Sequence, residues 1–382
     1  MLSRLRILMA LLMSLAFVAA SCGGDDAEEP SSADDGAMDV AASSQKTLTD
    51  ECNENSDLDV PEDFNVVLVT DIGKVDDGTF NEFAYNGLKG AEDCWGIETS
   101  FIETVSEADY AANLSTALSS DPEVVVSVGF LLATDTLAAA EANPGVSFIG
   151  IDQFHPEYPP NYVGVLFNEH EGGYIAGALA AAMSETGVIG VVAGREDVPP
   201  VVKFVNGYIN GAKAANPDIE VLSVYNESFT DPAKGGSDAD QFIGEGADVI
   251  FGAGGPTGSG AVAKAAEAGV WAIGVDQDEY HTTFAGGSGA GAEYLISSAM
   301  KRVDLGVMRN IQAAIEGTFI GSAYVLSAEN QGITYAPFHD AAVTDDAAAA
   351  VEAARAGLAD GSIATGVCFI DGILEGEGSA CD

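Results

Sequence analysis

The stretch Val66-Val67-Leu68-Val69-Thr70-Asp71-Ile72-Gly73-Lys74-Val75-Asp76-Asp77-Gly78-Thr79-Phe80-Asn81 decides the fold of this 382-residue chain. It opens with four β-branched or aliphatic residues, a run typical of a strand that is covered on both faces. Gly73 and Gly78 then allow the chain to turn sharply. The segment Thr79–Glu82 has the spacing of a capping box, which predicts that a helix begins there.

Three polar or aromatic residues follow the first part of this strand. Asp71, Phe80 and Asn81 fall between the predicted strand end and the first helical turn. That position is the carboxyl edge of a sheet, where open α/β folds bind ligands. The local pattern leaves a structural alternative open, in which Asp77 and Asn81 order the turn and Phe80 packs as a hydrophobic staple.

Strand-like and helix-like segments alternate along nearly the whole chain, which predicts an α/β fold with parallel sheets and crossover helices. Once the N-terminal region is set aside, roughly 320 residues remain, more than one hydrophobic core usually holds. We therefore expect two lobes, between which the chain crosses several times to form a multi-strand hinge. The first lobe is expected to comprise residues 61–167 and 279–320, and the second residues 168–278 and 321–382.

Residues 1–22 have the features of a lipoprotein signal peptide. Arg4 and Arg6 precede an apolar run that is too short for a membrane span. Ala19-Ala20-Ser21-Cys22 resembles a lipobox, in which the cysteine is diacylated and becomes the first residue of the mature protein; a plain cleaved signal peptide is the alternative. Acyl chains on Cys22 would hold the protein at the extracytoplasmic membrane face. Residues 23–60 are acidic and nearly free of aromatics, so we expect a disordered tether.

Four cysteines remain after Cys22, an even number that favours disulfides in an exported chain. We expect Cys52 to pair with Cys94, which would clip the end of the tether to the first helix. Cys368 is expected to pair with Cys381 and to close the C-terminal loop.

Metal binding is the competing use of such residues, and the sequence disfavours it. The chain contains no Cys-x-x-Cys, and its histidines are scattered singly at His155, His170, His281 and His339. We therefore expect no metal site.

The net charge of −46, from 60 acidic and 14 basic residues, narrows the range of ligands. Ordinary nucleic-acid binding is excluded because phosphate contacts need Lys and Arg. The same charge is hostile to anionic ligands and is tolerated more easily where salt screens it. A saline habitat is one interpretation; simple surface solubility is the other.

A glycine-rich segment, Phe251–Gly260, lies between a predicted strand and a predicted helix. Its glycines lack the G-x-G-x-x-G spacing and Pro256 interrupts the turn, so a Rossmann cofactor site is rejected. Gly254 and Gly255 would let a ligand approach the backbone closely. Tight packing of strand against helix explains the glycines equally well.

Further candidate residues lie at similar strand ends. Asp276 and Asp278 follow a buried run, and their carboxylates could accept hydrogen bonds from the paired hydroxyls of a sugar. Phe229 follows a strand of the second lobe and could clamp a flat ring against Phe80, although each is alone typical of a core aromatic. Lys301 is predicted in the first turn of a helix near 298–316, where the macrodipole disfavours a cation, so a nearby acid or a ligand should compensate it.

Taken together, these positions resemble the basic membrane protein family, the purine-nucleoside-type substrate-binding lipoproteins of ABC transporters. The similarity spans roughly Asn65 to Gly317, and several motifs recur in one order. They are Val69-Thr70-Asp71, Asp77-Gly78-Thr79-Phe80-Asn81, Gly172-Gly173-Tyr174-Ile175-Ala176-Gly177, Ser228-Phe229-Thr230-Asp231-Pro232-Ala233-Lys234-Gly235, Gly254-Gly255-Pro256-Thr257-Gly258, Trp271-Ala272-Ile273-Gly274-Val275-Asp276-Gln277-Asp278 and Met300-Lys301-Arg302-Val303-Asp304.

The resemblance implies a two-lobed type I periplasmic-binding fold that holds a nucleoside between its lobes. Phe80 and Phe229 would stack on the base, Asn81 would bind its polar edge, and Asp71 would lie nearby. The family's glycine-rich loop falls on residues 254–258.

The resemblance also assigns residues to the ribose. Asp276 or Asp278, together with Lys301, would bind its hydroxyls. Asp135 corresponds to a further polar ligand residue. Since a nucleoside is neutral, an acidic cleft can bind it through hydroxyls and ring nitrogens, whereas a nucleotide phosphate would be repelled.

The leading hypothesis is a lipid-anchored receptor at the cell membrane that closes on a purine nucleoside and delivers it to an ABC permease and its ATPase. We expect a monomer with no cofactor and no nucleic-acid partner. A nucleoside hydrolase is the main alternative, but the chain has no G-x-S-x-G or H-E-x-x-H motif, so no enzyme activity is expected. A surface sensor or adhesin with the same fold is the third hypothesis.

Overall fold

Strand β1 (Asn65–Ile72) is paired on both sides by parallel strands in the computed structural model, which describes residues 45–382. The first sheet has the strand order β11-β5-β4-β3-β1-β2. Val66 and Leu68 pack into one hydrophobic cluster, whereas Val67 and Val69 pack into another on the opposite face. The prediction of a strand covered on both faces is confirmed. The other strands are β2 (Glu98–Thr104), β3 (Val124–Val128), β4 (Ser147–Ile151), β5 (Tyr162–Phe167) and β11 (Ser322–Leu326).

The second sheet repeats this plan in the order β12-β10-β9-β8-β6-β7. Read along the two orders, β6 takes the place of β1, β8 that of β3, β9 that of β4 and β10 that of β5. One difference is at the edge, where β11 runs parallel to β5 but β12 runs antiparallel to β10. The strands are β6 (Val188–Ala193), β7 (Glu220–Tyr225), β8 (Val249–Ala253), β9 (Trp271–Asp276), β10 (Leu295–Lys301) and β12 (Ile333–Tyr335).

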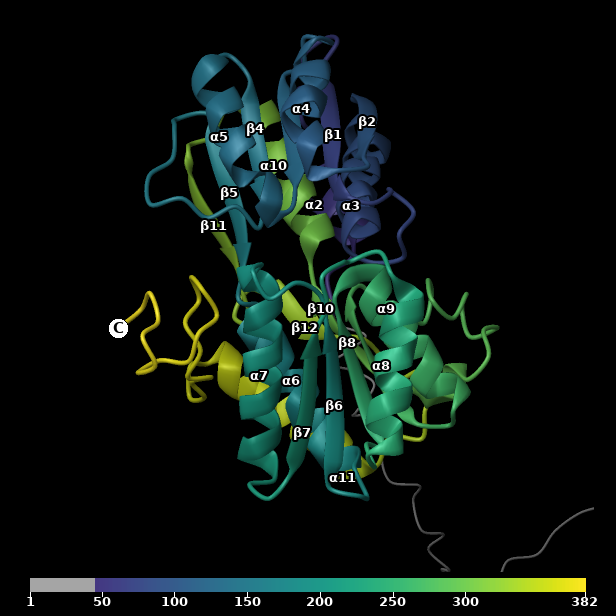
Figure 1. Ribbon diagram of the computed structural model, residues 1–382. Helices are drawn as coiled ribbons and strands as arrows, with labels where there is room; N and C mark the ends of the chain where they lie inside the picture. Colours follow the sequence, from purple (N-terminus) through teal and green to yellow (C-terminus); the bar gives the residue numbers. More distant parts are fainter. Residues whose placement is uncertain (1–44) are drawn as a thin grey trace, which may run out of the picture. The chain divides into compact units, whose positions relative to one another are not determined.

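Helices cover both sheets, and the fold class predicted from the sequence is confirmed (Figure 1). We call the first sheet and its helices the first lobe, and the second sheet and its helices the second lobe. The first lobe carries α3 (Phe80–Trp95), η1 (Glu107–Asp109), α4 (Tyr110–Leu118), η2 (Phe130–Leu132), α5 (Ala133–Ala142) and α10 (Val303–Ile315). The second carries α6 (Glu169–Met183), α7 (Pro199–Ala215), α8 (Pro232–Gly244), α9 (Gly255–Glu267), η3 (Ala292–Tyr294) and α11 (Asp345–Ala359).

The chain crosses between the lobes at three places, after β5, after β10 and after β11. The crossing segments lie against one another, because the Asn168 amide donates to Leu326 O at 2.9 Å and the Arg302 amide donates to Gly332 O at 2.9 Å. These crossings differ from the expected boundaries at 279 and 321. Strand β10 belongs to the second sheet and β11 to the first, since each pairs with the strand next to it in those sheets.

Strand β10 also corrects the predicted helix near 298–316. All of its residues are buried, and the helix begins only at Val303. Two polar side chains of the strand have partners in neighbouring segments of the second lobe: Ser297 Oγ donates to Ala336 O at 2.8 Å, and Ser298 Oγ accepts from the Glu279 amide at 3.1 Å. Tertiary hydrogen bonds therefore override the local preference.

Helices α6 and α7 of the second lobe pack with their backbones in contact. A Cβ added at Gly173 would lie 2.1 Å from Phe204 O, and one added at Gly177 would lie 2.1 Å from Tyr208 O. Glycines on α7 face α6 in the same way, since a Cβ at Gly207 would meet His170 O at 2.2 Å. This close approach brings the first turn of α6 beside the middle of α7.

The predicted signal peptide, Cys22 and the tether up to residue 44 lie outside the described residues. The end of the predicted tether is not disordered, because helix α2 (Leu48–Glu54) forms there. Glu51 of α2 accepts from Arg309 at 2.9 Å and pairs with Lys46 at 3.0 Å, and Cys52 is bonded to Cys94 of α3. These contacts order a segment whose composition alone indicates disorder.

Both predicted disulfides are confirmed. Cys52 pairs with Cys94 in the first lobe, and Cys368 pairs with Cys381 after α11. In the part of the chain that the structure describes, no helix has the length and apolar character needed to span a membrane.

Candidate functional site

A cleft of about 620 Å³, partly open to solvent, lies where the carboxyl ends of the strands of both sheets face each other. Eight of the ten sequence-predicted ligand residues line it. They are Asp71, Phe80, Asn81, Phe229, Gly254, Gly255, Asp276 and Lys301.

The first lobe contributes a connected group of polar side chains. The Asp71 amide donates to Asn81 Oδ1 at 3.0 Å, and Asn81 Nδ2 donates to Asp77 Oδ2 at 3.0 Å. The Tyr110 hydroxyl donates to Asp71 Oδ1. Burial raises the pKa of Asp71 to about 6 despite this hydrogen bond. The arrangement holds Asn81 in one orientation toward the cleft.

The start of helix α3 is ordered by Asp77 rather than by the predicted capping box. The Asp77 carboxylate accepts from the amides of Thr79 and Glu82, at 3.0 and 3.1 Å, whereas Thr79 makes no side-chain cap. The Gly78 amide donates to Glu82 Oε2 at 2.9 Å. The turn-forming role foreseen for Asp77 is confirmed, and Asp77 also lines the cleft.

A buried charge network lies between the lobes at the base of the cleft. Lys301 Nζ is 2.6 Å from Asp152 Oδ2 of the first lobe and 2.9 Å from Glu169 Oε1 of the second. Lys203 of α7 also pairs with Glu169 and donates to Phe167 O at 2.9 Å. The expectation of a compensating acid near Lys301 is confirmed. Lys301 ends strand β10 rather than sitting in a helical turn, so the macrodipole argument for it was wrong.

Burial shifts the titration of this network. It opposes the charged form of Lys301, but the neighbouring carboxylates outweigh it and raise the lysine pKa. Burial raises the pKa of Asp152 to about 6 even though Lys301 lies beside it. Asp152 Oδ1 is buried without a hydrogen-bond partner in the described structure, so this oxygen can accept a hydrogen bond from a ligand.

Asp152 and Asp276 occupy matching places in the two lobes. Asp152 directly follows β4, Asp276 ends β9, and both have a left-handed backbone, with φ of 64° and 67°. Such a conformation costs a non-glycine residue about 1–3 kcal/mol and is concentrated at functional sites. Burial raises the pKa of Asp276 to about 7.

Two aromatic rings enter the cleft from opposite lobes. Phe80 is the first residue of α3, and Phe229 lies between β7 and α8. Lys301 Nζ lies 4.9 Å from the centroid of the Phe80 ring, within cation–π range. The half-buried rings of Phe80 and Phe229 pack against the core, and both rings also line the cleft.

The glycine-rich loop packs tightly against its neighbours and also lines the cleft. A Cβ at Gly254 would lie 2.3 Å from the Gly194 amide nitrogen, and one at Gly194 would lie 2.3 Å from the Phe229 ring. Glycine is therefore required for packing, and the same residues expose their backbone to the cleft.

Two predicted ligand residues lie elsewhere. Asp135 is half-buried in the first turn of α5 and does not line the cleft. Asp278 points away from it and accepts from His339 Nε2 at 2.7 Å. Asp135 lies five residues after Phe130 and Asp278 two residues after Asp276, and only Phe130 and Asp276 of these four line the cleft.

Sequence reasoning missed Asp152, Glu169 and Lys203. Asp152 follows the correctly predicted strand β4, so the strand-end rule applied to Asp276 would have found it. Glu169 and Lys203 depend on the approach of α6 to α7 and carry no such signal.

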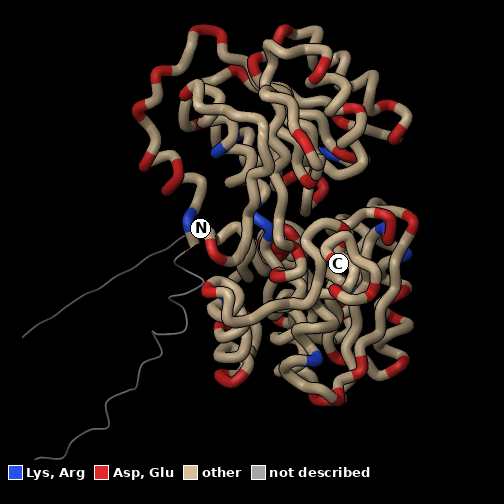
Figure 2. Tube along the Cα trace, turned by 90° about the vertical axis from the view of Figure 1, so that its left-hand side faces the viewer, with Lys and Arg blue, Asp and Glu red and all other residues tan. Residues whose placement is uncertain are grey.

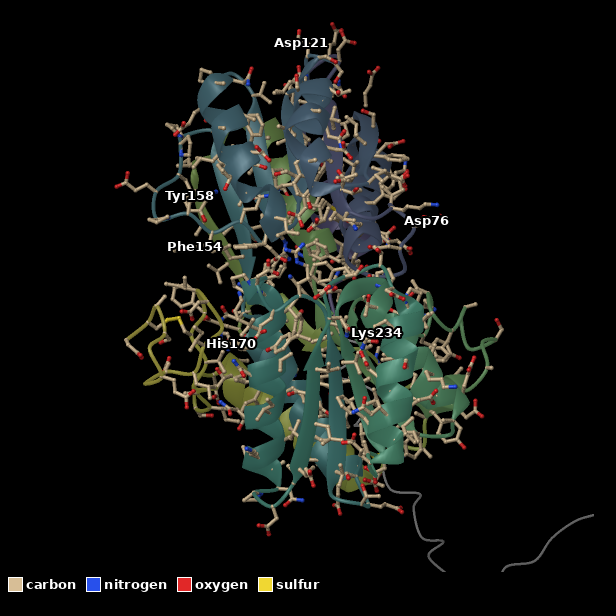
Figure 3. The ribbon with its side chains drawn as sticks, in the orientation of Figure 1. Asp76, Asp121, Phe154, Tyr158, His170 and Lys234 are labelled. Carbon is tan, nitrogen blue, oxygen red and sulfur yellow. A yellow bond between two sulfur atoms is a disulfide. The ribbon has the colours of Figure 1, made fainter. Side chains whose placement is uncertain are left out.

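A second hollow borders the buried charge network and is lined by Phe154, which lies between the lobes in Figure 3.

Three further polar contacts join the lobes around the cleft. Arg195, after β6, forms an ion pair with Glu107 of the first lobe. Thr282 Oγ donates to Gly78 O at 2.8 Å, and Gln277 Nε2 donates to Thr79 O at 3.3 Å. The lobes are thus closed on each other in this structure.

Acidic residues are spread over the outside of both lobes, with few basic residues among them (Figure 2).

Comparison with known proteins agrees with this architecture. The family model described as Bmp, ABC transporter substrate-binding protein PnrA-like, matches residues 64–335. A CD4+ T-cell-stimulating antigen of Listeria monocytogenes is 30% identical over 317 residues, which cover 79% of this chain and 87% of that protein. The ABC transporter nucleoside-binding protein BmpA of Lactococcus lactis is 30% identical over 323 residues, which cover 80% of this chain and 89% of that protein.

Among solved structures, a solute-binding protein of an ABC transporter system from Aeropyrum pernix K1 superposes with a TM-score of 0.70 at 26% identity, covering 79% of this chain and 92% of that one. Two lobes closed over a cleft at their strand ends define a type I solute-binding protein. More narrowly, the chain belongs to the Bmp, PnrA-like family of ABC transporter substrate-binding proteins. The resemblance seen in its motifs is thereby confirmed.

Proposed function

We propose that this protein captures a purine nucleoside between its lobes and delivers it to the permease of an ABC importer. The observation that carries the proposal is the composition of the cleft. Phe80 and Phe229 enter it from opposite lobes, with Asn81 beside Phe80 and the carboxylates of Asp152 and Asp276 deeper in. A flat ring with a polar edge and a hydroxyl-bearing sugar matches this set. The relative from Lactococcus lactis is itself named a nucleoside-binding protein.

Electrostatics favours a neutral ligand over an anionic one. Four aspartates line the cleft, namely Asp71, Asp77, Asp152 and Asp276. Lys301 lines it too, but its ammonium is already paired with Asp152 and Glu169. A phosphate would meet uncompensated negative charge, whereas a nucleoside would not.

The hydrogen-bonding capacity left in the cleft fits a nucleoside. The Asp152 Oδ1 atom lacks a partner and can accept from a ribose hydroxyl, as can the Asp276 carboxylate. Asn81 Nδ2 uses one hydrogen on Asp77, which leaves the second for an acceptor on the base. Each charged hydrogen bond of this kind contributes about 1.5–3 kcal/mol.

The same proposal includes attachment of Cys22 to lipid at the extracytoplasmic face, a position that suits delivery to a permease. Relatives in Pyrococcus carry the name lipoprotein. A hydrolase would release free base on incubation with inosine, whereas a binding protein would return the nucleoside intact. Following the base by chromatography separates the two functions.

Isothermal titration with inosine, adenosine and inosine monophosphate tests the ligand class on protein freed of bound ligand by unfolding and refolding. We expect a nucleoside to bind at one site per chain, and the monophosphate to bind at least about tenfold more weakly because of charge repulsion. Asp276→Asn should weaken binding, whereas Asp135→Asn, outside the cleft, should not. Equal or tighter binding of the monophosphate, or no binding of any nucleoside, would overturn the proposal.

A further inference from the structure

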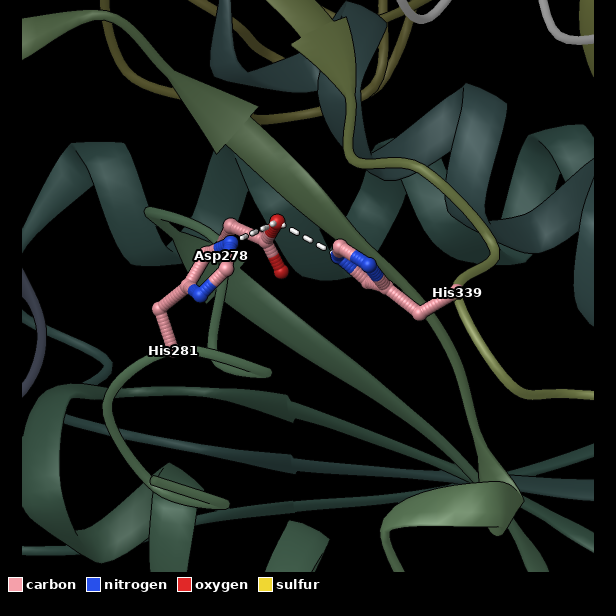
Figure 4. A group of neighbouring side chains, drawn as sticks. All are labelled: Asp278, His281 and His339. Carbon is pink, nitrogen blue, oxygen red and sulfur yellow. Dashed lines mark hydrogen bonds and ion pairs between the residues drawn. The ribbon is translucent and has the colours of Figure 1, made fainter. Parts of the chain in front are cut away.

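We propose that Asp278, His281 and His339 form a binding site for a divalent transition metal ion of the zinc type. The three side chains come together on the second lobe although 58 residues separate the two histidines in the sequence. Figure 4 shows the imidazoles on either side of the Asp278 carboxylate. The site is separate from the nucleoside cleft, which none of these residues lines.

The distances suit a shared ion. His339 Nε2 lies 2.7 Å from Asp278 Oδ2, His281 Nε2 lies 3.7 Å from the same oxygen, and one ligand atom from each residue falls within 4.8 Å of the others. Tetrahedral zinc holds nitrogen and oxygen ligands at about 2.0–2.2 Å, which places neighbouring ligand atoms roughly 3.4 Å apart. The observed separations bracket this value. The His281 side chain is 66% exposed, so it can rotate to close the set.

The donor set selects the kind of metal. Two imidazoles and one carboxylate suit zinc and its neighbours, whereas calcium and magnesium prefer oxygen ligands alone. Three protein ligands also leave a fourth position for water, as in open zinc sites. An isolated cluster of acids, common on a chain this acidic, would lack both imidazoles.

Contacts around the three residues fix their orientation. Asp278 Oδ1 accepts from the Tyr280 amide at 3.2 Å, which leaves Oδ2 directed at the imidazoles. The Tyr280 ring stacks on His339 at 3.9 Å with an interplanar angle of 12°, and its hydroxyl donates to Asp340 Oδ2 at 2.7 Å. Metal sites in proteins commonly hold their ligands with such outer contacts.

A metal ion here would tie two separate segments together. Asp278 and His281 belong to the connection between β9 and β10, residues 277–294, and His339 follows β12. The same connection carries Gln277 and Thr282, which contact the first lobe. The ion would therefore hold the interlobe contacts of this connection in place.

Titration of metal-free protein with Co²⁺ in a non-chelating buffer tests the site, because its visible absorption reports the ligand set. We expect one ion per chain, displaced by Zn²⁺ and not by a large excess of Ca²⁺. The His281→Ala, His339→Ala double variant and Asp278→Asn should each weaken binding by at least about tenfold. His155→Gln, at a histidine far from the site in sequence and joined to Tyr162, should leave it unchanged.

Hydrogen exchange provides a second readout that does not depend on the nucleoside. Zn²⁺ should slow exchange of the amides in residues 277–294 in the natural protein and not in the double variant. Circular dichroism confirms that the variants are folded. Co²⁺ binding of equal strength in the double variant, or displacement by Ca²⁺, would show that the ion binds the acidic surface generally and would overturn the proposal. The absence of any bound Co²⁺ would overturn it as well.

Discussion

The two lobes share one strand order but present different chemistry to the cleft between them. The first lobe supplies polar groups at its strand ends and at the start of α3, namely Asp71, Asp77, Asn81 and Asp152. The second supplies two charged groups at its strand ends, Asp276 and Lys301, and an apolar and backbone wall around Phe229 and the glycine loop. The shared strand order determines which backbone positions border the cleft. The amino acid at each of these positions determines the chemical groups that the cleft presents.

The sharpest contrast is between the ends of β5 and β10, which take the same place in their sheets. Strand β5 ends in Phe167, and β10 ends in Lys301. Lys301 Nζ lies 4.8 Å from the centroid of the Phe167 ring, so the two counterparts touch across the crossing segments. One cation thus joins carboxylates of both lobes at the point where the chain passes between them.

Replacing Lys301 with an apolar residue, which is what β5 has at the matching position, should cause the largest loss of folding stability. Lys301→Met leaves Asp152 buried without its cation and Glu169 with Lys203 alone, and breaking a buried pair in this way costs about 3–5 kcal/mol. Urea unfolding at pH 8 should show a loss of this size.

Lys264→Met is the matched control, because that lysine is partly exposed and pairs with Asp240 at 3.3 Å. It should change the unfolding free energy by less than about 1 kcal/mol. If both variants lost the same stability, the buried network would not be the element that holds the crossing together.

The disulfides allow a second comparison, since each constrains a different region. Cys52 and Cys94 are 42 residues apart and join α2 to α3 of the first lobe, whereas Cys368 and Cys381 are 13 apart. Loop entropy predicts losses of about 4 and about 3 kcal/mol when the pairs are replaced by alanine.

The two double alanine variants, unfolded in urea under identical conditions, check this order. Natural protein treated with reductant serves as the control for the substitutions themselves. If removal of the Cys368–Cys381 disulfide, which closes the shorter loop, cost more stability, packing around the fully buried Cys368 would outweigh chain entropy.

Much of this framework could be predicted from the sequence, because buried parallel strands are continuous apolar runs. Three such apolar runs predict strands at Val124–Val128, Ser147–Ile151 and Val188–Ala193, and the strands of the structure have these bounds. Strand β5 was missed. A strand was predicted at 292–296 and a helix from 298, so only the first two residues of β10 were predicted as strand and its last four were assigned to the helix. The serines of β10 look unlike a strand until their partners, Ala336 O and the Glu279 amide, are known.

The residues of the candidate site also fall into two groups, those that the sequence could predict and those that it could not. Residues next to a recognisable strand end, such as Asp71 and Asp276, could be found from local pattern. Glu169 depends on how closely α6 approaches α7. His281 and His339 look solitary in the sequence, and only the packing of the β9–β10 connection against the segment after β12 brings them together. Such convergence is tertiary, so no local signal reports it.

The two aromatic residues test whether both lobes hold the base. Phe80→Ala and Phe229→Ala should each weaken inosine binding by about 1–3 kcal/mol, the range for stacking of a base on an aromatic side chain. Calorimetric titration measures both losses, and Phe101→Ala, on a surface strand away from the cleft, is the control. A loss from only one of them would mean that the base rests on a single lobe.

The paired aspartates predict a dependence of stability on pH. Burial raises the pKa of Asp276 to about 7 and that of Asp152 to about 6, from 3.8. The folded protein therefore holds protons that the unfolded chain releases, and the free energy of unfolding should fall as pH rises from about 4 to about 7.

Asp276→Asn removes one of these groups, so the free energy of unfolding of the variant should fall less over this range, by at least about 1.4 kcal/mol, the amount that corresponds to one tenfold difference in proton affinity. Urea unfolding of both proteins across this pH range measures the difference. Asp135→Asn controls for loss of a carboxylate outside the cleft. Identical pH profiles for Asp276→Asn and the natural protein would contradict a raised pKa at this position.

The smallest effect is expected at the rim, where Arg195 of the second lobe pairs with Glu107 of the first. Glu107 is 49% exposed, so solvent screens the pair, and such pairs contribute about 0.2–1 kcal/mol. Because the pair joins the lobes, its free energy favours the closed form, and Arg195→Ala should lower nucleoside affinity slightly at low salt and not at high salt. Asp197→Ala, which removes the partner of Arg195 within its own lobe, is the control. A large loss that salt does not change would show that Arg195 holds the closed form through packing, and the rim would then join the lobes as firmly as Lys301 does.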